Sequence, residues 1–244
     1  MQYALVNNMR SEPIKGINGL CCGCGKKVIS KCGNIKLHHW AHISSDKCDS
    51  WWENETEWHR QWKNHFTIDT REVTFYDSVL AEYHRADVHN KNGVTIEFQN
   101  SPLTIEELNS RNEFYKRIIW VVNGKKFKGF EITHNIPDPN CDMLQEWDFL
   151  HGRHLAFASK SDAKKSMVRL YSLNCPELRE LTLSQSHLSF VWKYAHAAWY
   201  TSTTPIFIDF GGEQLYWLRR RIQERYDYWY LQQVSKLSFL SKYR

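Results

Sequence analysis

Cysteine is concentrated in one short stretch of the chain, and this concentration limits the possible folds more than any other feature. Four of the seven cysteines lie between positions 21 and 32, and Cys48 follows after the run His38-His39-Trp40-Ala41-His42. An odd cysteine count without a secretory signal argues against a disulfide-rich secreted domain and favours a reducing, cytoplasmic location. In that environment a cysteine cluster is typical of a metal site.

The spacing within this stretch predicts a structural zinc site. Zn²⁺ takes four nitrogen or sulfur ligands in a tetrahedron, and two short turns can supply them in pairs. Cys21 and Cys24 form a C-x-x-C pair beside glycines. The second pair comes from His39, His42 and Cys48, of which we expect His42 with Cys48 and keep His39 as the alternative. A thiol-redox site is disfavoured because no βαβ pattern precedes the pair. Two further cysteines are expected to take no part: Cys22 and Cys32.

Composition places the chain among ordinary globular proteins. With 244 residues it has room for one large domain or two small ones, and 42% of its residues are hydrophobic. The net charge of +5 permits a polyanionic partner without requiring one. No apolar run approaches the roughly 20 residues of a membrane span, so no membrane association is expected.

An aromatic-rich segment follows the cysteines and predicts a helix. Between Trp51 and Phe66 the aromatic residues recur close to a 3.6-residue period, which indicates a helix with an aromatic core face. Glu55, His59 and Lys63 are spaced four apart and line a second face of this helix.

The pattern then changes to that of a small mixed unit. Residues 86–89 and 94–99 alternate around the turn signal 90–93, which predicts a β-hairpin. A capping box opens a helix over about 104–116, and the apolar run 118–122 predicts a buried strand. The order helix, hairpin, helix, strand indicates an α/β or α+β fold.

Three carboxylates occupy informative positions in this unit. Glu55 lies on the first helix, Asp87 on the first hairpin strand and Glu97 on the second. One acid on a solvated strand face is ordinary, but oxygen ligands from two strands and a helix suit Mg²⁺ or Mn²⁺. Such an ion can polarise a phosphodiester and lower the pKa of an attacking water.

Strand parity adds a condition on the hairpin. Joined by a two-residue Asn92-Gly93 turn, the strands would place Asp87 opposite Phe98, on the wrong face. Asp87 and Glu97 point together only if the loop has an odd length or the hairpin contains a bulge. We therefore predict that irregularity.

The remainder of the chain gives weaker signals. Strand-like pieces occupy 130–183, 187–200 is predicted to be helical, and 205–210 is predicted to be a buried strand. The segment 213–237 is predicted to be mostly helical. A mostly helical C-terminal region is therefore expected, whose role in binding DNA, a protein partner or a second copy is open.

Taken together, the motifs resemble the competence protein CoiA-like family, whose core belongs to the PD-(D/E)XK nuclease superfamily. The resemblance covers about residues 18–124. The matching pieces in chain order are Cys21-x-x-Cys24, His39-Trp40-Ala41-His42, Glu55-Thr56-x-x-His59-x-x-x-Lys63, Arg85-Ala86-Asp87-Val88, Ile96-Glu97-Phe98-Gln99-Asn100-Ser101, Arg111, Tyr115 and Ile119-Trp120.

The resemblance implies a restriction-endonuclease-like mixed sheet flanked by helices. It further implies a zinc-ribbon-like N-terminal module at 1–50 and a nuclease core at 51–125. Residues 126–244 then form a C-terminal α/β region of unclear role.

The resemblance also implies residue roles. Asp87 and Glu97 are the metal ligands, and Glu55 supports them. The superfamily lysine position is Gln99 here, which cannot act as a base. Lys63 then supplies the missing positive charge or is an ordinary surface lysine, and His59 shuttles a proton or hydrogen-bonds Glu55. The candidate catalytic residues are Glu55, His59, Lys63, Asp87, Glu97 and Gln99.

Basic residues near the end of this core are candidate phosphate contacts, with a merely solvated basic face as the alternative. They include Arg111, Lys116, Lys125 and Lys126. The expected function is a Mg²⁺- or Mn²⁺-dependent DNA endonuclease acting in DNA uptake, recombination or defence. A catalytically inactive, zinc-stabilised DNA-binding or assembly module is the alternative, and an RNA-directed nuclease is a weaker one because no RNA-reading motif is present.

Overall fold

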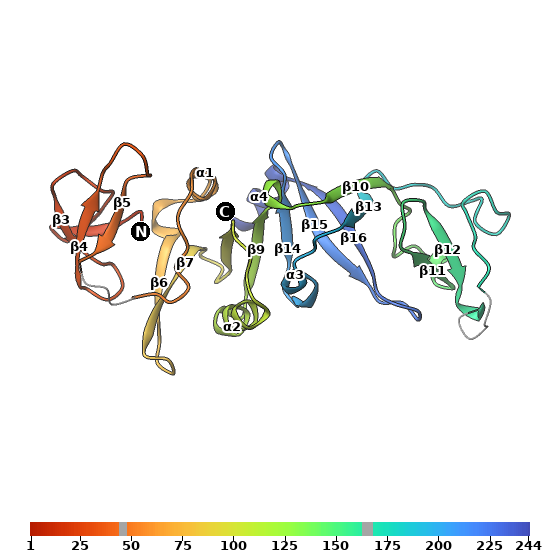
Figure 1. The fold of residues 1–244 in the computed structure, drawn as a ribbon, viewed down its shortest axis with the longest axis horizontal. Helices are drawn as coiled ribbons and strands as arrows, with labels where there is room; N and C mark the ends of the chain where they lie inside the picture. Colours follow the sequence, from red (N-terminus) through yellow and green to blue (C-terminus); the bar gives the residue numbers. More distant parts are fainter. Residues whose placement is uncertain (44–47, 163–167) are drawn as a thin grey trace. The chain divides into compact units, whose positions relative to one another are not determined.

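The computed structural model describes residues 1–43, 48–162 and 168–244 (Figure 1). The chain forms two compact units, one of residues 1–121 with 240–244 and one of residues 122–239. Among the described residues, no helix is long and apolar enough to cross a lipid bilayer. Strands outnumber helices in both units, and the predicted α+β class is confirmed.

The first unit begins with a small antiparallel sheet in the order β2-β1-β3-β4-β5. Its strands are β1 (Ala4–Val6), β2 (Met9–Ser11), β3 (Asn18–Leu20), β4 (Lys27–Lys31) and β5 (His39–His42). The few buried side chains of this sheet centre on Trp40, Val28, Ala4 and Cys21. A core of this size stabilises a module weakly, so a metal or another crosslink is expected to supplement it.

The second part of this unit carries the strand order β9-β8-β7-β6. Its elements are α1 (Glu57–Lys63), β6 (Arg71–Asp77), β7 (Glu82–His89), β8 (Thr95–Gln99), α2 (Ile105–Tyr115) and β9 (Ile118–Asn123). The hairpin, the second helix and the buried strand lie where the sequence predicts them. In β9 every residue is buried, as the uninterrupted apolar run indicates.

The first helix is shorter than predicted. It comprises Glu57–Lys63, so the prediction of a helix over 51–66 is wrong for residues 51–56 and 64–66. The Trp51 ring instead stacks on His84 with centroids 3.3 Å apart, which holds this segment away from a helical path. The predicted aromatic face is correct within the helix, because Trp58 and Trp62 pack on Phe98 of β8.

The hairpin between β7 and β8 has the irregularity that strand parity requires. Val88 pairs with Ile96 and His89 with Thr95. The Asn90 N–H donates to the Val94 carbonyl at 3.0 Å, which leaves a three-residue loop, and Gly93 in that loop has φ +72°. The same register places positions 87 and 97 opposite each other, so the predicted odd-length loop is confirmed.

The second unit contains an antiparallel sheet in the order β10-β13-β16-β15-β14. The strands are β10 (Phe130–Asn135), β13 (His187–Trp192), β14 (Ile206–Asp209), β15 (Gln214–Arg221) and β16 (Tyr228–Ser235). A separate hairpin comprises β11 (Trp147–Leu150) and β12 (Ala156–Ser159). The remaining helices are α3 (Ala197–Thr201) and α4 (Lys236–Tyr243), with 3₁₀ turns at Ile68–Thr70, Gly124–Lys126, Asp142–Leu144 and Lys160–Asp162.

The prediction of a helix at 187–200 is correct only for 197–200, which lie in α3, and is wrong for 187–196, which include β13. The prediction of a mostly helical 213–237 is wrong, and the C-terminal region is mostly strand. Most of 213–237 is the β15–β16 hairpin, which pairs over eight residues from Gln214 with Ser235 to Arg221 with Tyr228. Leucine, arginine and glutamine favour helices locally, but each of these strands finds its hydrogen-bond partner in the other. Aromatic residues such as Trp217, which stacks on Phe207, also fit a pleated surface.

We expect Gly93→Ala to lower the free energy of unfolding by about 1 kcal/mol, because a Cβ is strained at positive φ. Urea denaturation measures the change. Gly33→Ala is the matched control, since an added Cβ there meets nothing within 4 Å. Equal stability of the two variants would contradict the strained-loop interpretation.

Candidate metal centre and acidic pocket

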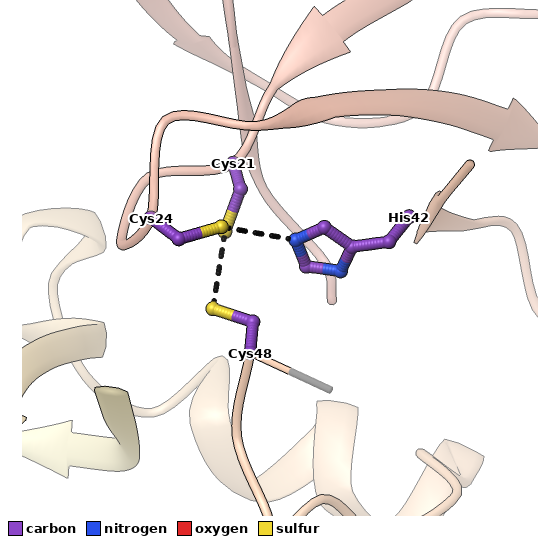
Figure 2. Close-up of side chains that lie close together, drawn as sticks. All are labelled: Cys21, Cys24, His42 and Cys48. Carbon is purple, nitrogen blue, oxygen red and sulfur yellow. Dashed lines mark hydrogen bonds between the residues drawn. The ribbon is translucent and has the colours of Figure 1, made fainter. Parts of the chain in front are cut away.

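Four side chains of the N-terminal sheet converge on one point. The ligand atoms of Cys21, Cys24, His42 and Cys48 all lie within 4.8 Å of one another, and Figure 2 shows the thiols facing the imidazole. Cys24 Sγ is 3.3 Å from His42 Nε2, and Cys21 Sγ is 3.9 Å from Cys48 Sγ. Tetrahedral zinc sites place neighbouring ligand atoms about 3.5–3.8 Å apart, so this group fits such an ion.

Local structure explains why these residues meet. Cys21 and Cys24 occupy the turn between β3 and β4, where the Gly23 N–H donates to Cys21 Sγ at 3.4 Å and Gly25 takes φ +69°. His42 is the last residue of β5, which pairs antiparallel with β4 and places His42 opposite Val28. N–H groups directed at sulfur favour a thiolate, the form that binds metal.

The thiol chemistry also favours a bound cation. Burial, followed by the neighbouring Cys21, raises the pKa of the Cys48 thiol to about 12. All seven cysteines are free, so no disulfide relieves this crowding. A divalent cation would stabilise the thiolates and reverse the shift. The group can therefore hold a metal ion such as zinc.

The structure distinguishes between the alternatives left open by spacing. His42 is in the cluster, whereas His39 directs Nδ1 to the Leu37 carbonyl at 2.9 Å. The two cysteines expected to take no part lie near backbone carbonyls instead: Cys22 near Tyr3 and Cys32 near Pro13.

Asp87 and Glu97 lie side by side on adjacent strands. The Asp87 N–H donates to Glu97 Oε1 at 3.3 Å, and the Phe98 N–H donates to Asp87 Oδ2 at 2.9 Å. Burial raises the pKa of both carboxyl groups, and Asp87 raises that of Glu97 further. A cation bound between these two buried carboxylates would offset the burial and mutual repulsion that raise their pKa values, so the pair is suited to binding one.

These acids line a pocket in which negative charge is in excess. Six carboxylates face it, against three lysine and arginine side chains. The acids are Asp49, Glu53, Glu55, Glu72, Asp87 and Glu97, and the bases are Lys63, Arg85 and Arg111. Because buried charges are stable only when compensated, the imbalance favours a cation in this pocket.

Lys63 is a fixed internal charge and not a surface lysine. Its side chain is 2% exposed, and Nζ lies 2.6 Å from Glu55 Oε1 and 2.9 Å from Glu72 Oε1. Burial alone would lower the Lys63 pKa, but Glu72, Asp87 and Glu55 together hold it above the ordinary value. Lys63 therefore remains protonated and cannot serve as a general base.

Glu53 is a pocket residue that sequence reasoning missed. Gln99 Nε2 donates to Glu53 Oε2 at 2.9 Å, and His59 Nε2 lies 3.9 Å from the same oxygen. Burial, with Asp87 nearby, raises the Glu53 pKa. Glu55, in contrast, is paired with Lys63. Glu53 lies outside the helical spacing that identified Glu55, and no sequence signal pointed to it.

His59 is fixed in one tautomer. The Thr56 backbone N–H donates to His59 Nδ1 at 3.1 Å, so Nδ1 must be the acceptor and Nε2 carries the proton. That proton faces Glu53 and not Glu55, the partner that the sequence suggested.

The structure separates the residues predicted to bind a cation or to contact phosphate. In the part of the chain that the structure describes, the Cys₃His group is the one set of three or more acidic, cysteine or histidine side chains close enough to hold an ion. Glu55 thus does not join Asp87 and Glu97 in a three-carboxylate cluster. Arg111 is 5% exposed and bound to Glu97 and Glu107, whereas Lys116, Lys125 and Lys126 are exposed.

Comparison with protein families gives two consecutive matches. The model of the competence protein CoiA N-terminal domain matches residues 14–50, and that of the competence protein CoiA nuclease-like domain matches residues 55–205. The second match alone covers more than half of the chain. No curated protein and no solved structure matched significantly.

We expect the purified protein to bind about one equivalent of zinc and Cys48→Ser to lose most of it, with a lower melting temperature, because three ligands hold zinc weakly. Elemental analysis and thermal melting measure both effects. Cys32→Ser is the control and should keep zinc and stability. Full zinc content in Cys48→Ser would contradict the ligand assignment.

We expect Lys63→Met to cost about 3–5 kcal/mol in the free energy of unfolding, because Glu55 and Glu72 lose their buried counter-charge. Lys91→Met, at an exposed position, should change it by less than about 0.5 kcal/mol. Lys63 holds the Glu72 pKa below its ordinary 4.5 even though burial opposes this. The stabilisation from the Lys63–Glu72 ion pair is fully present above pH 4.5 and is lost as the pH falls and Glu72 becomes protonated. The difference in unfolding free energy between wild type and Lys63→Met should therefore narrow in acid. Urea denaturation across pH checks the sign.

Proposed function

Because the chain belongs to the competence protein CoiA family, we propose that it is a Mg²⁺- or Mn²⁺-dependent nuclease that hydrolyses DNA phosphodiester bonds. The nuclease-like domain of this family falls in the PD-(D/E)XK superfamily, which supports the reaction class. The observation that carries the proposal is the pairing of Asp87 with Glu97 on adjacent strands of an acid-rich pocket. A role in handling incoming DNA or in defence is part of the proposal.

The donor set fits a hard divalent cation. Mg²⁺ usually binds through one or two carboxylates, keeps several waters and takes further oxygens from substrate phosphates. Two carboxylates therefore suffice, and a closed protein cage is not required. Asp87 and Glu97 would hold the ion, which when bound would activate water and polarise the scissile phosphate.

The chain's own residues define the rest of the mechanism. Asp87 Oδ2 is fixed by the Phe98 N–H, and Glu97 Oε2 lies 3.4 Å from Arg111 Nη1. These contacts hold the carboxylates in place before substrate binds, which lowers the cost of reorganisation. Lys63 contributes a permanent positive charge beside Asp87 and helps to keep that acid ionised.

Gln99 and His59 act on Glu53 in this scheme. Gln99 stands where the superfamily has lysine, and its amide orients Glu53 by a 2.9 Å hydrogen bond. The His59 Nε2 proton faces the same carboxylate. We propose that Glu53 is the third acid of the pocket and that Glu55 anchors Lys63.

The Cys₃His group is proposed to hold structural zinc. Its donors are the soft and borderline ligands that zinc prefers, and four protein ligands leave no open position for a reacting water. Its expected contribution is to the stability of the small N-terminal sheet.

A catalytically inactive DNA-binding module is the second candidate. Gln99 in place of the superfamily lysine is compatible with it, since the amide cannot carry charge or accept a proton from water. Gln is common at this position in the family, so the replacement does not by itself imply inactivity. Binding of DNA without metal-dependent cleavage would support this candidate over the first.

We expect Asp87→Asn with Glu97→Gln to reduce Mn²⁺-dependent cleavage of DNA at least about 100-fold, because the residues that hold the ion lose their charge. Gel assays with single-stranded, duplex and branched DNA measure cleavage, and calorimetry measures Mn²⁺ binding. Asp69→Asn with Glu113→Gln is the matched control at exposed positions. Undiminished cleavage by the first double variant would refute the site.

A further inference from the structure

Two neighbouring strands of the second unit separate before they end. β13 and β16 pair only at His187 with Gln232 and at Leu188 with Leu231, although β13 continues to Trp192 and β16 begins at Tyr228. Beyond the paired residues, the strands are joined by side chains, since Tyr228 Oη donates to Ser189 Oγ at 2.9 Å. A space between adjacent strands of one sheet is thereby opened.

Aromatic side chains line the pocket at this divergence. Phe190 and Trp192 come from β13, Trp229 from β16 and Tyr200 from α3, while His151 and Gly152 follow β11. The pocket has a volume of about 360 Å³. That size falls within the roughly 300–1,000 Å³ of small-ligand sites.

The angles between the aromatic rings of this pocket suit a planar ligand. Tyr200 meets Trp229 at 69° with centroids 4.9 Å apart, and Trp192 meets Tyr200 at 56° and 5.9 Å. Two other rings of the pocket are stacked on rings outside it, Phe190 on Phe130 at 13° and Trp192 on Phe127 at 26°. Because Tyr200 and Trp229 meet edge to face, the edge of one ring lies against one face of the other, and the remaining faces of the pair are not covered by this contact.

A buried polar atom at the pocket lacks a partner. Trp192 is 8% exposed, and its Nε1–H has no hydrogen-bond acceptor among the described residues. A buried indole N–H normally finds an acceptor, so one that reached this solvent-shielded atom, such as a carbonyl or ring nitrogen, would complete it. Burial raises the Tyr200 pKa to about 12, so this hydroxyl stays neutral beside such a ligand.

One positive group contacts a ring of this pocket, and two others are next in sequence to its lining residues. Arg220 lies over the Trp229 ring at 5.7 Å, Lys193 follows Trp192, and Arg153 follows Gly152. Arg220 and Arg153 are 47% and 75% exposed, in ion pairs of 3.3 Å with Asp227 and 3.7 Å with Glu131. Exposed pairs of this kind are weak and can exchange for phosphate.

We propose that this pocket binds an unpaired nucleobase of single-stranded DNA. A flat ring with hydrogen-bond acceptors, carried on an anionic backbone, matches the aromatic walls, the unpartnered indole N–H of Trp192 and the cation of Arg220 over the Trp229 ring. Bases within a duplex are stacked and paired, so they cannot enter. The proposal rests on the proposed DNA-processing function and assigns single-stranded DNA as a ligand of the C-terminal unit.

The test measures binding of fluorescein-labelled oligothymidine in EDTA, so that cleavage plays no part. Trp229→Ala and Tyr200→Ala should each weaken binding on the order of 10-fold, the effect of losing one stacked base. Trp229→Phe should restore most of the affinity. Tyr76→Ala, which removes an exposed tyrosine of the first unit, is the control and should bind as wild type does. Circular dichroism and thermal melting confirm that each variant is folded.

Three competitor arms separate the base from the backbone. An abasic oligomer of equal length and a matched duplex should compete at least 10-fold more weakly than oligothymidine. The proposal would be overturned if the abasic oligomer or the duplex competed as well as oligothymidine. It would also be overturned if folded Trp229→Ala bound oligothymidine as wild type does, or if oligouridine bound more tightly than oligothymidine. The binding assay contains no divalent metal, so it is independent of cleavage. If the protein cleaves DNA but its oligothymidine binding does not depend on Trp229 and Tyr200, only the base-binding proposal is refuted. If the binding depends on them but no cleavage is found, only the nuclease proposal is refuted.

Discussion

The buried ion pair between Lys63 and Glu72 is the contact on which the first unit depends. Glu72 accepts Lys63 Nζ with one oxygen and the Gln2 and Tyr3 N–H groups with both, so one carboxylate joins helix α1 to strand β6 and to the start of the chain. Glu72 holds this position with φ +46°, an uncommon value for a non-glycine residue. The same lysine also binds Glu55 and faces Asp87, so stability and pocket electrostatics share one charge.

The Cys₃His group and the acidic pocket are connected through a short segment. Cys48 is followed by Asp49, whose carboxylate accepts the N–H groups of Trp51 and Arg85. The Trp51 ring stacks on His84, and the Trp51 carbonyl accepts a hydrogen bond from Arg111. Fixing Cys48 therefore fixes the path of the chain into the pocket wall, and this candidate metal ligand and the Asp87 strand are parts of one packed arrangement.

Sequence reasoning succeeded where the signal was local. Ligand spacing narrowed the second pair of the Cys₃His group to His39, His42 and Cys48, and the structure selects His42 with Cys48. The odd-length loop follows from the two-residue period of strands combined with the requirement that Asp87 and Glu97 face together. It failed where distant partners decide the structure. Gln214 to Arg221 has helix-favouring residues, yet its hydrogen bonds go to β16. Glu53 was missed because its position depends on Gln99, a contact between residues 46 positions apart.

The three-residue loop between β7 and β8 has a consequence for how this protein can vary. Surface loops usually accept insertions and deletions because their length has little effect on the elements they join. Here the loop length sets whether two acids share a face, so a change by one residue would turn Asp87 away from Glu97 while leaving both strands intact. Length variation in this loop is therefore compatible with the pocket only in steps of two residues, or when a compensating bulge arises in the strand.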